Sequence, residues 1–179
     1  RKQQALLGQA CDHPLKVCLA MSNTPGAFDR APQMDALDLA SALAVLDMAA
    51  QSGLVHTISN RKSDISYVCN CCTCSCGLLR GISEAHIANV VARSAYFAVV
   101  DEDLCIGCGE CEVGCQFDAI TIDAVAIIDR VACVGCGVCT RVCPEGAISL
   151  VRRDPEEIKP IPNSTDEWLT QRRQARGMK

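Results

Sequence analysis

Two cysteine runs in the second half of the chain constrain its fold more than any other feature. Each run has the spacing Cys-x2-Cys-x2-Cys-x3-Cys. This spacing places three thiolates around one [4Fe–4S] cluster, and the fourth, displaced cysteine ligates the other cluster. A lone Cys-x2-Cys pair would also suit zinc or a redox pair, whereas two full copies indicate clusters. The predicted ligands are Cys105, Cys108, Cys111 and Cys143 for cluster I, and Cys133, Cys136, Cys139 and Cys115 for cluster II.

The two runs belong to an internal repeat with an offset of 28 residues, which takes Cys105 to Cys133 and Cys115 to Cys143. Each half reads as a cluster loop, a short helical turn and a strand, and residues 96–101 read as the first strand of the unit. The halves differ at Gln116, where the second half has Pro144. We therefore expect an α+β, two-cluster ferredoxin-like domain with a pseudo-two-fold repeat over residues 96–151.

Composition indicates the kind of core and the redox state of the compartment. The chain has 15 cysteines in 179 residues but only 3% aromatic residues, so bound clusters are expected to replace part of a hydrophobic core. The odd cysteine count and the spacings favour clusters over disulfides, which predicts a reducing compartment, the cytoplasm. No apolar run approaches the roughly 18–20 residues that span a bilayer, so no transmembrane segment is expected. The chain begins with Arg1, and we expect it to be the C-terminal part of a longer protein.

Charge is concentrated in the repeat. Residues 101–150 hold nine acidic and two basic side chains, whereas the residues before and after this block are slightly basic. An acidic surface repels phosphate backbones and attracts basic proteins. We therefore expect a basic redox partner and no nucleic acid.

Residues 1–95 carry a second cysteine-rich region. Its seven cysteines are Cys11, Cys18, Cys69, Cys71, Cys72, Cys74 and Cys76. Adjacent Cys71 and Cys72 cannot easily face one metal, so we expect about four of the seven to ligate a third [4Fe–4S] cluster. A zinc site and a group of reactive thiols are the alternatives.

This region is expected to be mainly helical. Leu39, Leu43, Leu46 and Ala50 recur at helical spacing before Gly53, which predicts a packing helix. The predicted elements are helices at 13–20, 34–52 and 84–93, with extended pieces at 54–56 and 65–68. His13 and His56 are expected to be structural, with a role beside a cluster as the alternative, and His86 is expected on an exposed helix face.

Residues 152–179 form a different kind of segment. Three prolines predict an extended linker, and Ser164 with Glu167 forms a capping-box pattern before a helix at about 165–176. Trp168 is the only tryptophan, and it is expected either to anchor this helix on the body or to dock a partner.

Two resemblances support this organisation. Residues 96–150 resemble bacterial-type two-cluster [4Fe–4S] ferredoxins at all eight ligand positions. The wider pattern, with Cys11-Asp12-His13-Pro14, Gly53-Leu54-Val55-His56 and Cys69-Asn70-Cys71-Cys72, resembles the "4Fe-4S dicluster domain-containing" proteins of anaerobic microbes. That family commonly has cysteine where this chain has Ser75, and a winged-helix-like region upstream. The resemblance implies redox electron transfer.

The predicted function is single-electron transfer, as a free protein or as a subunit of an oxidoreductase. All eight cluster ligands in the repeat are cysteines, which leaves no open iron for a substrate and favours transfer over catalysis. One alternative is an accessory or catalytic subunit of an anaerobic oxidoreductase complex, whose N-terminal cluster acts on a substrate or couples electrons to protons. The other alternative is an iron–sulfur redox sensor.

Overall fold

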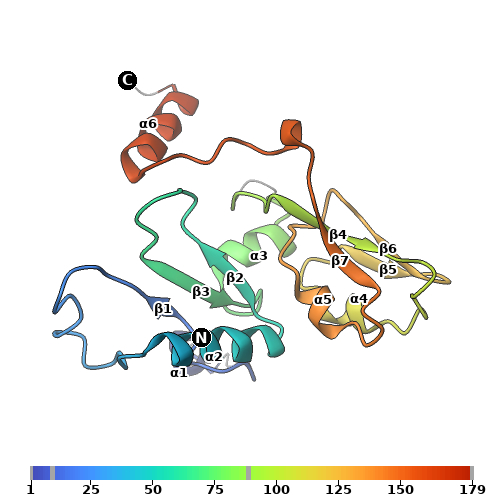
Figure 1. The fold of residues 1–179 in the computed structure, drawn as a ribbon, viewed down its shortest axis with the longest axis horizontal. Coiled ribbons are helices and arrows are strands. Elements are labelled where there is room, and N and C mark those ends of the chain that lie inside the picture. Colours follow the sequence, from blue (N-terminus) through green and yellow to red (C-terminus); the bar gives the residue numbers. More distant parts are fainter. Residues whose placement is uncertain (1, 9–10, 88–89, 178–179) are drawn as a thin grey trace.

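The computed structural model describes residues 2–8, 11–87 and 90–177. Two lobes lie side by side, and the C-terminal segment runs back over the first of them (Figure 1). We call residues up to 87 the N-terminal lobe and residues 96–152 the repeat unit. None of the described helices is both long enough and apolar enough to cross a membrane.

The N-terminal lobe is built on a three-stranded antiparallel sheet with the order β1-β3-β2. Its longest helix begins at Asp38, whose carboxylate accepts a hydrogen bond from the Ser41 N–H at 2.8 Å, and ends before Gly53, which has a positive φ. The elements of the lobe are α1 (Lys2–Leu6), β1 (Leu19–Ala20), α2 (Leu39–Gln51), β2 (Val55–Ile58), β3 (Tyr67–Cys71) and α3 (Gly77–Ser83). The helix expected at 34–52 is confirmed over residues 39–51, starting five residues later than expected, and both extended pieces are confirmed.

Two helix predictions in this lobe are wrong. Residues 13–20 form bends and then β1, because Val17 is fully buried and Leu19 pairs with Val68 of β3. The helix expected at 84–93 is replaced by α3, which starts directly after the cysteine run and ends at Ser83. Among its described residues, 84–87 and 90–93, the predicted segment has turns and bends, and residues 88–89 lie outside the described part. His86 therefore lies on no helix, although it is exposed as expected.

The repeat unit contains two antiparallel strand pairs and two short helices. Strand β4 pairs with β7 from Tyr96–Arg152 to Val100–Ile148, and β5 pairs with β6. The elements are β4 (Tyr96–Val100), α4 (Glu110–Gly114), β5 (Ile120–Ile122), β6 (Ala126–Ile128), α5 (Val138–Val142) and β7 (Ile148–Arg152). Helices α4 and α5 are separated by the 28-residue offset of the sequence repeat and contact each other. The mixed α+β class and the strand expected at 96–101 are confirmed.

Buried residues form three clusters, and one of them joins the lobes. The first lies inside the repeat unit, and the second lies between α2 and the cysteine segments. The third combines Val55 and Leu79 of the N-terminal lobe with Phe117 and Val138 of the repeat unit. This shared core fixes the two cysteine-rich regions relative to each other.

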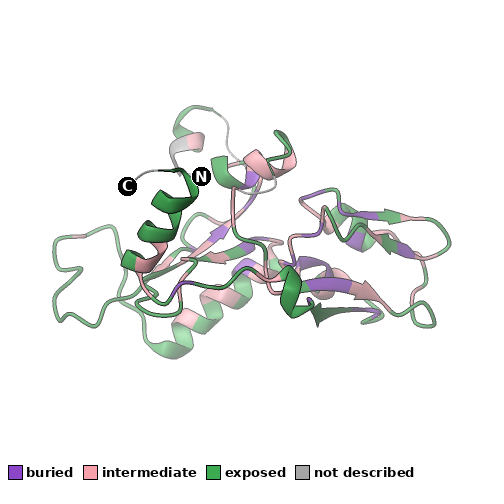
Figure 2. Cartoon of the chain, turned by 90° about the horizontal axis from the view of Figure 1, so that it is seen from above, coloured by how far each residue is buried: buried purple, intermediate pink, exposed green. Residues whose placement is uncertain are grey.

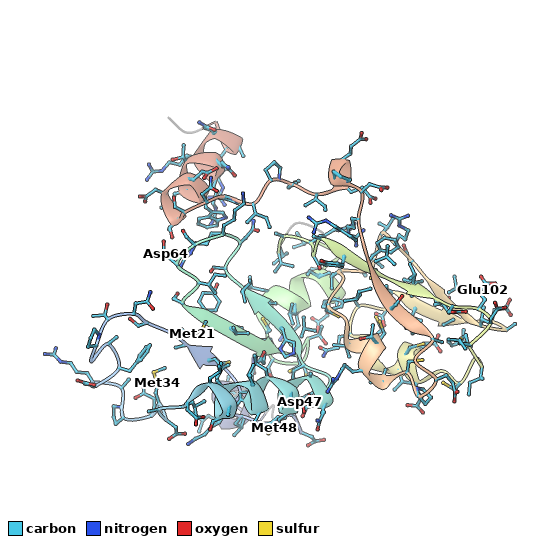
Figure 3. The ribbon with its side chains drawn as sticks, in the orientation of Figure 1. Met21, Met34, Asp47, Met48, Asp64 and Glu102 are labelled. Carbon is cyan, nitrogen blue, oxygen red and sulfur yellow. The ribbon has the colours of Figure 1, made fainter. Side chains whose placement is uncertain are left out.

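The C-terminal segment is attached mainly through its linker. The Lys62 N–H donates to the Pro162 carbonyl at 2.9 Å, and the Ser63 N–H to the Asn163 carbonyl at 3.1 Å. A 3₁₀ turn, η1 (Pro155–Glu157), precedes this contact, and α6 (Thr165–Ala175) follows it. Helix α6 is mostly exposed (Figure 2). Trp168 is only half-buried and lies beneath the Arg172 guanidinium. The linker between β2 and β3, where Figure 3 labels Asp64, is the surface that α6 approaches.

Candidate metal centres

The first cavity of the repeat unit collects the four cysteines predicted for cluster I. Cys105, Cys108 and Cys111 reach it from the loop before α4 and from α4 itself, and Cys143 reaches it from the end of α5. The cavity has about 310 Å³ of empty space, part of it open to solvent, and its lining also includes Glu145 and apolar side chains of β5, β6 and β7. A thiol-lined, apolar hollow of this kind suits a metal–sulfur cluster.

The second cavity has the same construction from the other half of the repeat. Cys133, Cys136 and Cys139 reach it from the loop before α5 and from α5, and Cys115 reaches it from the end of α4. Its empty space is about 360 Å³, close to that of the first cavity. In each cavity, therefore, three cysteines come from one run and the fourth from the other.

The cysteine loops are held tightly against neighbouring backbone. Gly107 has φ +63°, and a side-chain Cβ there would lie 2.6 Å from the Ala124 carbonyl oxygen. Gly135, its counterpart in the second loop, has φ +73°, and a Cβ there would lie 1.9 Å from the Tyr96 carbonyl oxygen. Only glycine fits such a position without displacing the chain. Both loops are therefore shaped to curl closely around the cavity.

The chemistry of these cysteines fits a cluster. The Ala126 N–H donates to Cys105 Sγ and the Ala119 N–H to Cys115 Sγ, each at 3.4 Å, as cluster-bound sulfur requires. Burial, followed by repulsion from neighbouring thiols such as Cys136, raises the pKa of Cys139 to about 12. Burial also raises the pKa of Cys111. A cationic metal centre is needed to hold these buried sulfurs as thiolates.

The N-terminal cysteines divide into two groups. The first consists of Cys18, beside β1, Cys69 and Cys71 on β3, and Cys76 at the start of α3. Burial and then the neighbouring Cys76 and Cys69 raise the pKa of Cys71 to about 12, and the pKa of Cys69 is raised by burial, Cys18 and Cys76. Alternate residues of a strand point to the same face, which places Cys69 and Cys71 together. We call this group the β3 quartet.

The second group contains the other three cysteines and one histidine. Cys11, His13, Cys72 and Cys74 have ligand atoms that all lie within 4.8 Å of one another. Cys72 is buried with Val17, Ala49 and Leu54, whereas Cys74 is exposed. Burial raises the pKa of Cys11, but hydrogen bonds from Ser75 and His13 outweigh it and hold that pKa at about 6. We call this group the Cys3His group.

The two other histidines lie apart from these groups. His56 is exposed on β2, and its Nδ1 forms a hydrogen bond with Oδ1 of the fully buried Asn70. Asn70 in turn donates to the Val17 carbonyl, so this pair braces the segment that carries Cys18. His56 therefore has the structural role that the sequence favoured, while His13 joins a cysteine group.

Gln116 is a functional residue that the sequence reasoning missed. Its Oε1 accepts a hydrogen bond from the Thr73 N–H at 2.8 Å, and its Nε2 donates to the Gly53 carbonyl. It follows Cys115 directly, and Thr73 lies between Cys72 and Cys74. The side chain thus ties the second cavity to the N-terminal cysteine run. The signal was present in the sequence, because Gln116 stands where the second half of the repeat has proline.

Arg153 is a second residue that was missed. Its side chain is buried, donates to the Cys133 carbonyl at 2.7 Å, and lies 5.5 Å from the centre of the Phe97 ring. It places a positive charge beside the second cavity and supports the cysteine loop that begins at Cys133. Composition gave no hint of this role, because Arg153 stands in a run of ordinary surface charges.

Comparison with known protein families agrees with this geometry. Residues 98–150 match the family described as the 4Fe-4S dicluster domain. The match runs from within β4 to within β7 and so covers the repeat unit. The chain therefore contains a two-cluster ferredoxin-type domain. No curated protein matches the sequence of the chain.

Proposed function

We propose that this protein relays single electrons through two ferredoxin-type [4Fe–4S] clusters and a third cluster in the N-terminal lobe. The observation that carries the proposal is the pair of cavities, each lined by four cysteines drawn from both runs. When bound, such clusters supply a reversible one-electron couple. With four thiolates available per cluster, no iron needs a substrate as its ligand, which favours electron transfer over catalysis.

The ligand sets follow from the cavity linings and the spacing. Cys105, Cys108, Cys111 and Cys143 would hold cluster I, and Cys115, Cys133, Cys136 and Cys139 would hold cluster II. The recurrence of the same helix, glycine conformations and loop at the 28-residue offset supports a pseudo-two-fold relation between the halves. Such a relation would give the two clusters similar surroundings at a short separation.

The β3 quartet would hold the third cluster. Its four members are all cysteines, and the influence of Cys18 and Cys76 on the pKa of Cys69 and Cys71 supports their lying close together. The core that joins the lobes contacts Cys71 and Cys76 on one side and Cys115 and Cys136 on the other. The third cluster would therefore lie next to cluster II, and the relay would run from cluster I through cluster II to the third cluster.

The outer end of this relay would meet a redox protein. Ile106, which lines the first cavity, is 65% accessible, and Val113 of α4 is 87% accessible, both within the acidic part of the sequence. A small apolar patch with an acidic surround suits a basic partner, as in transient redox encounters. We place the protein in an oxidoreductase complex of an anaerobe, in the reducing cytoplasm that free thiols require.

Paired cysteine substitutions test the ligand sets. Cys111 and Cys115 lie four residues apart at opposite ends of α4, yet they line different cavities. Cys111→Ser should abolish the electron paramagnetic resonance signal of one reduced cluster, and Cys115→Ser that of the other. The remaining signals should still titrate reversibly by one electron. Loss of the same signal in both variants would contradict the exchange of ligands between the two runs.

A further inference from the structure

The second group of N-terminal ligands is built from two short chelating arms. Cys11 and His13 are separated by one residue, and so are Cys72 and Cys74. Cys11 Sγ lies 3.8 Å from Cys72 Sγ, and Cys74 Sγ lies 3.9 Å from His13 Nδ1. The two arms therefore meet ligand atom to ligand atom, although 61 residues separate them in the sequence.

These separations match a single tetrahedral ion. With zinc–sulfur bonds of about 2.3 Å, the edge of a tetrahedron between two sulfurs is about 3.8 Å. In a [4Fe–4S] cluster each cysteine binds a different iron, so the sulfurs stand further apart than around one ion. Within residues 2–8, 11–87 and 90–177, no other set of Cys, His, Asp or Glu ligand atoms is as compact.

The surroundings are partly buried, and the donor set is that of a structural site. Cys72 belongs to a core with Val17, Ala49 and Leu54, and Cys11 packs against that core. The Ser75 hydroxyl lies 3.5 Å from Cys11 Sγ, within reach of a hydrogen bond to the sulfur. Three thiolates and one imidazole fill all four positions around zinc and leave none for a substrate.

The order of the ligands along the chain suggests that a metal here would stabilise the fold of the cysteine run. Cys72 and Cys74 lie between Cys71 and Cys76, which belong to the β3 quartet. Residues 11–18 have neither helix nor strand, so a metal held by Cys11 and His13 would supply the energy that fixes this segment. Zinc is redox-inert, so an ion here would brace the cysteine run without taking part in electron transfer.

We propose that Cys11, His13, Cys72 and Cys74 bind one Zn²⁺ ion in a closed tetrahedral Cys3His site, separate from the three iron–sulfur clusters. Zinc is counted independently of iron and sulfide. A wrong zinc assignment can therefore be told apart from a wrong third cluster.

The test measures metal content and zinc affinity on the full chain, produced with both iron and zinc present and purified without oxygen. The wild-type protein should carry about one zinc per chain. His13→Ala should lower the affinity for Zn²⁺, measured by competition with a chromophoric chelator, by at least about tenfold. Iron and sulfide should not change. Co²⁺ bound in place of zinc should give the visible absorption of a tetrahedral thiolate site. In the same variant, in which three thiolates remain, its d–d bands should shift and Co²⁺ should bind more weakly.

Two further variants control for folding and chemistry. His13→Cys restores four ligands and should retain zinc, and His86→Ala, which changes an exposed histidine outside the group, should also retain it. Zinc absent from the wild-type protein, or unchanged affinity in His13→Ala, would overturn the proposal. So would a loss of about four irons and four sulfides in Cys74→Ser, because that residue would then be a cluster ligand. One iron in excess of sulfide, in place of zinc, would overturn the choice of metal.

Discussion

Gln116 offers the sharpest test of how the two cysteine-rich regions are joined, and Gln116→Ala is the change to make. The side chain is half-buried, accepts from the Thr73 N–H at 2.8 Å and donates to the Gly53 carbonyl. Each such bond contributes about 1 kcal/mol net, and a partner left unpaired and buried costs about 1–3 kcal/mol. Losing both bonds should therefore destabilise the closed arrangement around Thr73 by about 2–3 kcal/mol.

Hydrogen exchange followed by mass spectrometry measures this local destabilisation around Thr73 directly. A loss of 2–3 kcal/mol corresponds to roughly 30- to 150-fold faster exchange, because about 1.4 kcal/mol is a factor of ten. The increase should appear in peptides that cover residues 70–76. Magnetic interaction between reduced cluster II and its N-terminal neighbour should weaken in the same variant.

Two matched variants make the result specific. Gln116→Glu keeps an acceptor for the Thr73 N–H but loses the donor to Gly53, and should give an intermediate rate. Gln51→Ala removes an exposed glutamine whose side chain donates to Asp47 on its own helix, and should leave exchange in residues 70–76 unchanged. Unchanged exchange in Gln116→Ala would refute the reasoning that this side chain couples the second cavity to the N-terminal cysteine run.

Three further predictions follow from packing and charge. Gly135→Ala should lower the free energy of unfolding by about 2–5 kcal/mol, because the left-handed backbone is strained and the new Cβ collides with the backbone. Gly109→Ala, which has open space at φ +85°, should lower it by only about 1–2 kcal/mol. Equal losses in thermal or denaturant unfolding would contradict the tight fit at Gly135. Arg153→Met should lower the free energy of unfolding by about 1.5–3 kcal/mol, because the bond to the Cys133 carbonyl is lost. Removing this buried cation should also make the reduction potential of cluster II more negative in a redox titration, and an unchanged potential would argue against its electrostatic role. The ion pair between Arg141 and Asp47, the latter labelled in Figure 3, is about half exposed. A double-mutant cycle should therefore give a coupling free energy below about 1 kcal/mol. A larger value would mean that this contact, rather than the shared core, joins the lobes.

The repeat unit could be predicted because its constraints are local. One short stretch of sequence contains the cysteine spacing, the glycines and the 28-residue offset. The structure has its elements where that pattern requires them, in α4, α5, β4 and β7. The helix α2 was equally accessible, because its apolar period and the stop at Gly53 are also local signals.

The N-terminal lobe was harder because its order depends on contacts between distant segments. Asp12 and Pro14 favour a helix start locally, but burial of Val17 and pairing of Leu19 with Val68 decide that the segment is extended. Similarly, the seven cysteines appeared as one pool in the sequence. Two cysteines of the first group share one face of β3, whereas Cys72 and Cys74 follow the end of that strand. The ligands Cys11 and Cys18 are distant in sequence, so local patterns could not assign them.

The most direct test of the account is the number of irons and acid-labile sulfides per chain after anaerobic purification, together with the number of distinct reduced-cluster signals. Two ferredoxin-type clusters and one cluster at the β3 quartet predict about twelve irons, about twelve sulfides and three signals, each cluster taking up one electron. A result of about eight irons, eight sulfides and two signals would contradict the three-cluster relay and confine electron transfer to the ferredoxin-type domain.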